Sequence, residues 1–138
     1  MILVDTSVLI DFLKGAINDY VSLFDDILDK HIPFGINEFI YQEVLQGSKT
    51  ITEFNKLKEY FETIPFYYLS EEKKSFEKAA YMNFTCRRAG ITIRSTIDLL
   101  IAQTAIENNL YLLHKDEDFT NIAKIIPELK IYKKGDFA

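Results

Sequence analysis

The 138-residue chain has one cysteine and no long apolar run. A lone Cys86 cannot form a disulfide within the chain, which is typical of a reducing cytoplasm, the location that we expect. No apolar stretch approaches the roughly 18–20 residues of a transmembrane helix. Asp5 lies where a signal peptide would be apolar, and no basic segment precedes it, so we expect no export signal. There is also no Cys/His cluster with zinc spacing.

Basic residues are fewer than acidic ones, 16 against 21, and the net charge is −5. This balance argues against a uniformly basic surface that binds nucleic acid. All three arginines, Arg87, Arg88 and Arg94, nevertheless lie within eight residues that contain no acid. A solvated helix end is the ordinary interpretation of such a run, and binding of an anionic partner is the alternative. The length, 48% hydrophobic content and lack of a linker or repeat predict one globular domain over residues 1–138.

Short apolar runs alternate with segments of helical periodicity along the chain. Such alternation predicts right-handed βαβ units, and therefore a three-layer α/β/α fold with a mostly parallel central sheet of four to five strands. The predicted strands cover residues 1–4, 33–36, 64–69, 110–113 and 130–132, and the predicted helices cover about 6–14, 18–30, 38–46, 50–62, 71–89, 95–109 and 117–126.

Four carboxylates follow strands or open helices at comparable places. Asp5 directly follows the first strand, and Glu43 lies on the helix after the second. Asp98 lies in the first turn of the most apolar helix, and Asp116 comes soon after the fourth strand. Each has an ordinary explanation: an Asx turn, an exposed helix residue, the helix dipole, or a cap formed by Asp116 or Asp118. Because strand-to-helix junctions of a parallel sheet share one edge, we expect the four to converge.

Converging carboxylates indicate a bound cation. Two carboxylates about 5 Å apart repel by roughly 3 kcal/mol at an effective dielectric constant of 20, so four need neutralisation. Oxygen ligands without His or Cys select hard divalent ions, Mg²⁺ or Mn²⁺. Such ions activate water and bind phosphoryl oxygens, which favours phosphodiester hydrolysis.

The motifs in chain order resemble those of the PIN-domain ribonucleases, and most closely the VapC toxins of type II toxin–antitoxin pairs. The resemblance spans nearly the whole chain, and its four motifs are Val4-Asp5-Thr6-Ser7-Val8-Leu9-Ile10-Asp11, Glu43-Val44-Leu45-Gln46-Gly47, Ile93-Arg94 with Thr96-Ile97-Asp98-Leu99-Leu100-Ile101-Ala102, and Leu113-His114-Lys115-Asp116-Glu117-Asp118-Phe119.

The resemblance implies an endoribonuclease that uses Mg²⁺ or Mn²⁺. By matching motif, its catalytic and metal-binding acids would be Asp5, Glu43, Asp98 and Asp116, with Asp118 as a fifth candidate ligand. Thr6 or Ser7 would orient Asp5 by a hydrogen bond.

The resemblance also implies partners: an RNA substrate, a VapB-like antitoxin whose C-terminal segment lies across the acids, and a second copy in a homodimer. Arg87, Arg88 and Arg94 would contact RNA phosphates or antitoxin acids. Asp11 recurs in the family pattern, although a solvated helix residue explains it equally well. His114 departs from the Thr or Ser frequent in the family, and is either an acid or base or a structural residue.

Other functions fit the sequence less well. An aspartyl phosphatase needs a second Asp two residues after the first, where this chain has Ser7, and a receiver domain needs paired acids that are missing. A nuclease-dead binding domain predicts loss of one of the four acids, and all are present. A PIN nuclease of RNA processing, outside any toxin–antitoxin pair, remains the alternative.

Overall fold

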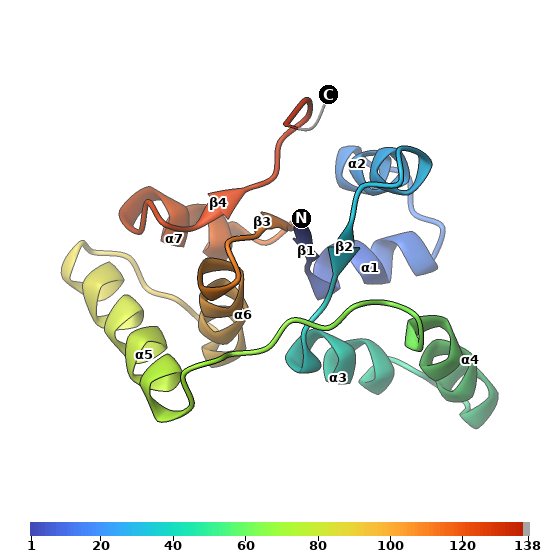
Figure 1. Ribbon diagram of the computed structural model, residues 1–138, viewed down its shortest axis with the longest axis horizontal. Helices are drawn as coiled ribbons and strands as arrows, with labels where there is room; N and C mark the ends of the chain where they lie inside the picture. The colour runs from blue at the N-terminus through green and yellow to red at the C-terminus, as the bar shows by residue number, and fades with distance from the viewer. Residues whose placement is uncertain (137–138) are drawn as a thin grey trace.

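The computed structural model describes residues 1–136, whose centre is a parallel four-stranded sheet. Its strands are β1 (Ile2–Val4), β2 (Phe34–Gly35), β3 (Tyr111–Leu113) and β4 (Lys130–Ile131), in the order β2-β1-β3-β4 (Figure 1). Leu3 pairs with Gly35 on one side and with Leu112 on the other. All of β1 is fully buried, as expected for a parallel sheet covered on both faces. The predicted fold class is confirmed.

The helices lie on two sides of these strands. Figure 1 shows α5, α6 and α7 on one side and α1 to α4 on the other. The chain leaves β1 through α1 and α2 to reach β2, then returns past β1 to place β3 on the opposite side. The strand order therefore reverses between β1 and β3, which is where open α/β sheets bind ligands. The helices are α1 (Thr6–Leu13), α2 (Asp19–Asp29), α3 (Glu38–Gln46), α4 (Ile51–Phe61), α5 (Lys73–Arg88), α6 (Thr96–Glu107) and α7 (Glu117–Ile125).

Side-chain caps begin several helices where the sequence predicts them. Asn37 accepts the backbone N–H of Ile40 at 2.8 Å at the start of α3. Thr50 accepts that of Glu53 at 3.1 Å at the start of α4. In a capping box the Glu53 carboxylate would accept the backbone N–H of Thr50. Here it accepts the backbone N–H of the preceding residue, Lys49. These caps satisfy amide groups that a helix start leaves without intrahelical partners.

The core centres on α6, in which every residue from 99 to 105 is buried. A helix apolar on all sides packs into the interior, and α6 contacts α3, α5, α7 and β3. The buried Thr104 hydroxyl donates to the carbonyl of Leu100 at 2.8 Å and accepts the side-chain amide of Asn37 at 3.1 Å. This bond holds the start of α3 against α6 and so relates two helices that carry candidate site residues.

The predicted third strand over residues 64–69 is wrong. The structure has only one isolated parallel bridge there, between Ile36 and Phe66. Ile36 donates to the Pro65 carbonyl at 3.0 Å, and Tyr67 donates to the Ile36 carbonyl at 2.8 Å. Pro65 has no N–H to donate, so the ladder does not extend into a strand.

No helix within residues 1–136 is both long enough and apolar enough to span a membrane.

Gly35→Ala should destabilise the protein. A Cβ at Gly35 would overlap the Pro65 carbonyl oxygen and come within 2.6 Å of the Tyr67 ring. Since one obstacle is backbone, we expect the free energy of unfolding to fall by about 1–3 kcal/mol, measured by urea denaturation. In the control Gly47→Ala the nearest atom is 3.4 Å from the added Cβ, and stability should be unchanged or slightly higher. Equal urea midpoints for Gly35→Ala and the wild type would contradict the close approach.

Candidate functional site

Asp5 lies at the reversal point between β1 and β3. Its backbone N–H donates to the Leu113 carbonyl at 2.9 Å, which joins it to the end of β3. Its carboxylate caps α1 and accepts the backbone N–H of Ser7 at 3.1 Å and the Ser7 hydroxyl at 2.6 Å. Only 4% of Asp5 is exposed. The hydrogen bond to Ser7 expected from the sequence is therefore present and sets the direction of the carboxylate.

Glu43 reaches the same edge of the sheet from α3. The Thr6 hydroxyl donates to its Oε1 atom at 2.9 Å, across 37 residues of sequence. Thr6 thus orients Glu43, while its neighbour Ser7 orients Asp5. Successive residues at the start of α1 hold two different carboxylates.

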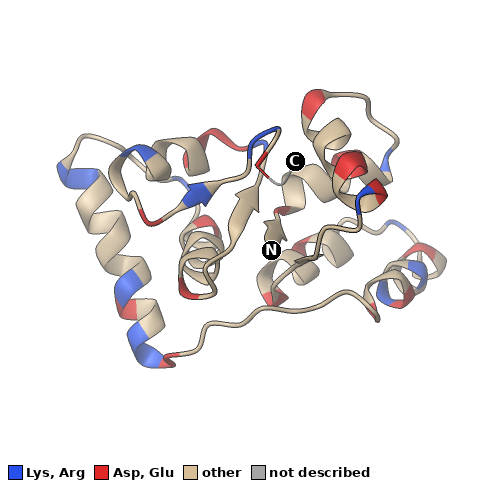
Figure 2. Ribbon diagram, turned by 45° about the horizontal axis from the view of Figure 1, so that its top comes forward, with Lys and Arg blue, Asp and Glu red and all other residues tan. Residues whose placement is uncertain are grey.

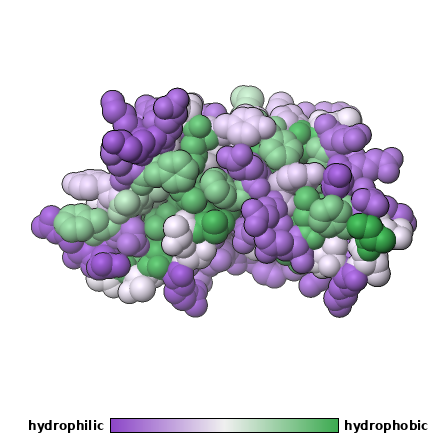
Figure 3. Space-filling model, turned by 90° about the horizontal axis from the view of Figure 1, so that it is seen from below, coloured by the Kyte–Doolittle hydropathy of each residue, from purple (hydrophilic) through white to green (hydrophobic). Residues whose placement is uncertain are grey.

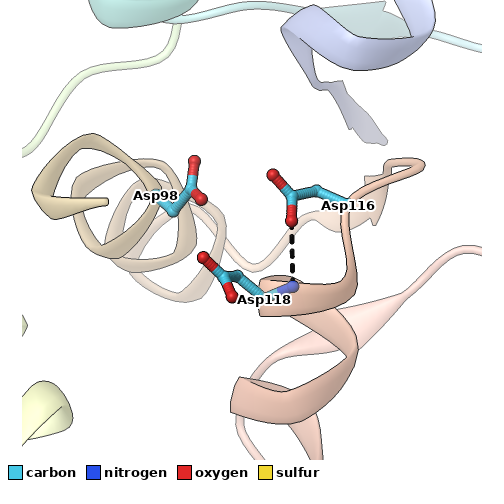
Figure 4. A group of neighbouring side chains, drawn as sticks. All are labelled: Asp98, Asp116 and Asp118. Carbon is cyan, nitrogen blue, oxygen red and sulfur yellow. Dashed lines mark hydrogen bonds between the residues drawn. The ribbon is translucent and has the colours of Figure 1, made fainter. Parts of the chain in front are cut away.

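Asp98, Asp116 and Asp118 point toward one space between α6 and α7 (Figure 4). Each offers a carboxylate oxygen, and these three oxygens all lie within 4.8 Å of one another. Asp116 caps α7 by accepting the backbone N–H of Asp118 at 2.9 Å. Asp118 is buried, and both of its oxygens face Arg94: the backbone N–H donates at 3.2 Å, and Nε lies 3.5 Å away. Asp118 therefore has a cationic partner, whereas within residues 1–136 neither Asp98 nor Asp116 forms an ion pair.

Electrostatics link all five carboxylates, which we call the acidic cluster: Asp5, Glu43, Asp98, Asp116 and Asp118. Burial and then repulsion from the other four raise the pKa of Asp98 to about 7. Burial also raises the pKa of Asp5 to about 6; the Ser7 hydrogen bonds oppose this shift, and Glu43 adds to it. The cluster thus holds negative charge at a free-energy cost, which a bound cation would remove.

The donor set of the acidic cluster fits a hard divalent cation. Among residues 1–136, the side-chain group with metal-binding spacing consists of carboxylates alone. His114 is close in sequence, but its Nδ1 atom accepts the backbone N–H of Asp116 at 3.2 Å, and its ring packs against Phe119. Burial lowers the pKa of His114, so its neutral form is favoured. These contacts favour the structural interpretation of His114.

Lys115 joins the loop that carries Asp116 to α1. Its backbone N–H donates to the Ser7 hydroxyl oxygen at 3.0 Å, and its ammonium group pairs with Asp11. Asp11 also accepts the side-chain amide of Asn18 at 3.0 Å. Asp11 is therefore a partner of the site loop and not a solvated residue. Sequence reasoning missed Lys115 and Asn18, because 104 residues separate Lys115 from Asp11 and no local pattern relates them.

The three arginines have different surroundings. Arg94 contacts Asp118 in the acidic cluster and leaves 75% of its own side chain exposed. Arg87 and Arg88 lie at the exposed end of α5, where the Arg88 guanidinium is 5.7 Å from the centre of the Phe84 ring. Figure 2 shows basic residues at both ends of this helix.

Fold and site together define an α/β protein that gathers carboxylates at the carboxyl edge of a parallel sheet. Comparison with known proteins is more specific. The chain belongs to the PIN-domain family, whose model matches residues 2–125. It is 31% identical over 127 residues to a VapC ribonuclease of Mycobacterium bovis and to the ribonuclease VapC11 of Mycobacterium tuberculosis, with 91% of this chain and 93% of each relative covered.

Solved structures show the same fold. VapBC2 from Rickettsia felis, bound to a DNA fragment from its promoter, matches with a TM-score of 0.71 and 20% identity, covering 96% of this chain and 98% of that one. VapBC-1 from nontypeable Haemophilus influenzae matches with a TM-score of 0.70 and 21% identity, with the same coverage.

Without metal, Asp98→Asn should stabilise the protein increasingly as pH rises. The raised pKa of Asp98 means that the folded protein binds this proton more tightly than the unfolded chain, so ionisation destabilises the fold between the ordinary carboxyl pKa and about 7. We expect the difference in Tm between the variant and the wild type to grow across that window and level off above it, measured by calorimetry in EDTA.

Mg²⁺ provides the control for this measurement. At saturating Mg²⁺ the advantage of Asp98→Asn should shrink or reverse, because the cation offsets repulsion in the wild type. A Tm difference that changes with neither pH nor Mg²⁺ would show that Asp98 does not share the charge of the acidic cluster.

Proposed function

We propose that the protein is a metal-dependent endoribonuclease and the toxin of a VapBC-type toxin–antitoxin pair. The observation that carries the proposal is the convergence of five carboxylates at the β1/β3 reversal point of a PIN-domain chain. The similarity to VapC ribonucleases over nine-tenths of the chain supports RNA as the substrate.

The cation would be Mg²⁺ or Mn²⁺, held by Asp5, Glu43, Asp98 and Asp116, with Asp118 as a fifth candidate ligand. When bound, such an ion supplies an activated water and stabilises charge on the phosphate. The protein's own residues set the geometry: Ser7 directs Asp5, Thr6 directs Glu43, and the backbone of Asp118 directs Asp116. The carboxylates hold the cation in this proposal and do not relay protons.

Arg94 has two tasks in this proposal. It neutralises Asp118, and its exposed guanidinium offers donors to an RNA phosphate or to a carboxylate of the antitoxin. A VapB-like antitoxin would cover the acidic cluster and block access of RNA. We further propose that the protein acts in the cytoplasm as a homodimer.

Purified protein freed of antitoxin should cleave structured RNA in Mg²⁺ or Mn²⁺, and EDTA should abolish cleavage. Asp5→Asn and Asp98→Asn should each lower kcat by at least about a hundredfold, because each removes a charged oxygen ligand. Gel assays with a set of structured RNAs measure this. Asp25→Asn, an exposed change on α2, is the matched control and should retain activity.

Intact RNA under all these conditions would overturn the nuclease proposal and favour a nuclease-dead binding domain. If the protein cleaves RNA but no antitoxin gene lies beside its own gene, the result would instead favour a PIN nuclease of RNA processing.

Asp116 and Asp118 should differ in their effect on metal affinity. Both oxygens of Asp118 face Arg94, whereas Asp116 uses one oxygen as a helix cap and has no cationic partner in the acidic cluster. Asp116→Asn should therefore weaken Mn²⁺ binding by about tenfold or more, and Asp118→Asn by less, as measured by calorimetric titration. A larger loss in Asp118→Asn would assign the ligand role to Asp118.

A further inference from the structure

Lys115 lies at the edge of the acidic cluster, but its charge is directed elsewhere. It directly precedes Asp116 in the loop between β3 and α7, and its backbone N–H donates to the Ser7 hydroxyl oxygen at 3.0 Å. That hydroxyl donates in turn to the buried carboxylate of Asp5 at 2.6 Å. The Lys115 backbone is therefore two hydrogen bonds away from the acidic cluster, whereas its ammonium group pairs with Asp11.

The side chain of Lys115 follows α1 away from the acidic cluster. Asp5 caps the start of this helix, Ser7 lies in its first turn, and Asp11 lies four residues beyond Ser7. Residues four apart share one face of a helix and are separated by about one turn of 5.4 Å. The stem of Lys115 therefore runs from Ser7 toward Asp11, along α1 and away from the capping carboxylate.

Asp11 is itself held in place by the turn between α1 and α2. The side-chain amide of Asn18 donates to the Asp11 carboxylate at 3.0 Å, and Asn18 also caps α2 by accepting the backbone N–H of Val21 at 2.9 Å. The backbone carbonyl of Asp11 accepts the N–H of Ala16 at 2.9 Å. Since only 18% of the Asp11 side chain is exposed, solvent screens this ion pair less than a fully exposed one.

The loop that carries Asp116 has other attachments than this ion pair. Its backbone is held at Lys115 by the Ser7 hydroxyl, and at Asp116 by the ring of His114 at 3.2 Å. The Asp116 carboxylate holds the backbone of Asp118 at 2.9 Å. A lysine ammonium is a point charge on a flexible stem, which makes it a weak tether. The ion pair therefore adds little to the position of the loop, and its main effect is to determine where a positive charge lies.

We propose that Asp11 keeps the Lys115 ammonium out of the acidic cluster and so preserves the affinity of the cluster for a divalent cation. The inference rests on the cation of the proposed function and makes Asp11 a positioning residue that acts through Lys115. Opposite charges in a partly buried site attract each other far more strongly than in bulk water. A released ammonium would therefore pair with the carboxylates and occupy the space that the cation needs.

Arg94 shows how a cation binds to this cluster. Its Nε atom lies 3.5 Å from a carboxylate oxygen of Asp118, and its backbone N–H donates to the other oxygen. That contact already offsets part of the negative charge. A second cation from Lys115 would offset more of it, so the position of Lys115 bears directly on the charge that remains for a metal ion.

An ordinary surface ion pair is the rival interpretation. Hydrophilic side chains surround the apolar patches of the surface, as Figure 3 shows for one face, and ion pairs among such side chains contribute little. The pair of Lys78 with Glu71, beside the start of α5, is of this kind, with side chains 53% and 42% exposed. It provides a matched control outside the acidic cluster.

Calorimetric titration of the metal-free protein with Mn²⁺, without RNA, tests the proposal. Asp11→Asn keeps an oxygen for the Asn18 amide but releases Lys115. If the released ammonium occupies the cluster for about nine-tenths of the time, the apparent Mn²⁺ affinity falls about tenfold. Lys115→Met removes the ammonium and keeps the stem, so it should bind Mn²⁺ as tightly as the wild type or more tightly. The double variant should recover most of the loss.

The control variant Glu71→Gln should bind Mn²⁺ like the wild type, because it breaks an ion pair that lies outside the acidic cluster. Circular dichroism and Tm of each variant, measured before titration, show that it is folded.

A second measurement uses no cation. In EDTA, at a pH where Asp98 is ionised, Asp98→Asn should raise Tm by removing one charge from the acidic cluster. In an Asp11→Asn background the released ammonium already offsets that charge, so the gain in Tm should fall by about half or more. Adding Lys115→Met should restore the gain.

Equal Mn²⁺ affinity in Asp11→Asn and a wild type that binds Mn²⁺ would overturn this inference alone. A loss shared equally by Asp11→Asn, Lys115→Met and the double variant would also overturn it, because the pair would then act as a tether of the loop. A wild type that binds no Mn²⁺ would overturn the cation of the proposed function together with this inference. Failure to cleave RNA bears on the proposed function and not on this inference, since both measurements are made without RNA.

Discussion

The burial of carboxylates close to one another at one edge of the sheet is the constraint on which the rest of this structure depends. The β1–β3 pairing brings Asp5 beside the loop that carries Asp116, and α3 and α6 add Glu43 and Asp98. Ionised Asp5 and Asp98 oppose folding in this partly buried space, because burial first and neighbouring carboxylates second raise the pKa of each. The fold must therefore hold them in place with other bonds.

Those bonds start from the first turn of α1. Thr6 holds Glu43, and Ser7 holds Asp5 and accepts the backbone N–H of Lys115, so two adjacent hydroxyls contact three parts of the site. The Asn37–Thr104 bond relates α3 to α6 from within the core. Such support trades stability for a pre-arranged set of carboxylates, a usual exchange at functional sites. Residues such as Thr6 and Ser7, which hold a carboxylate in place, would therefore affect the binding of a cation that they do not themselves contact.

Local patterns allowed most elements to be predicted, because strand length, helical periodicity and caps are properties of neighbouring residues. The caps at Asn37 and Thr50 are examples. Residues 64–69 were predicted wrongly, because an apolar run does not reveal that Pro65 interrupts the ladder. The Asp11–Lys115 pair and the Arg94–Asp118 contact were not predicted, because both depend on segments that are distant in sequence and meet only after folding.

The sequence by itself determined the alternation of strands and helices and placed carboxylates at strand-to-helix junctions, because both follow from residue order. Only the tertiary structure decided which carboxylate has which partner. In the folded protein Asp118 contacts Arg94, Asp116 caps α7, and His114 accepts a backbone N–H. The tertiary structure also left Phe76 and Phe84 of α5 about half exposed, because burial depends on how the layers pack. The physical reason is that hydrogen-bond partners and burial are set by three-dimensional distance, which residue order does not specify.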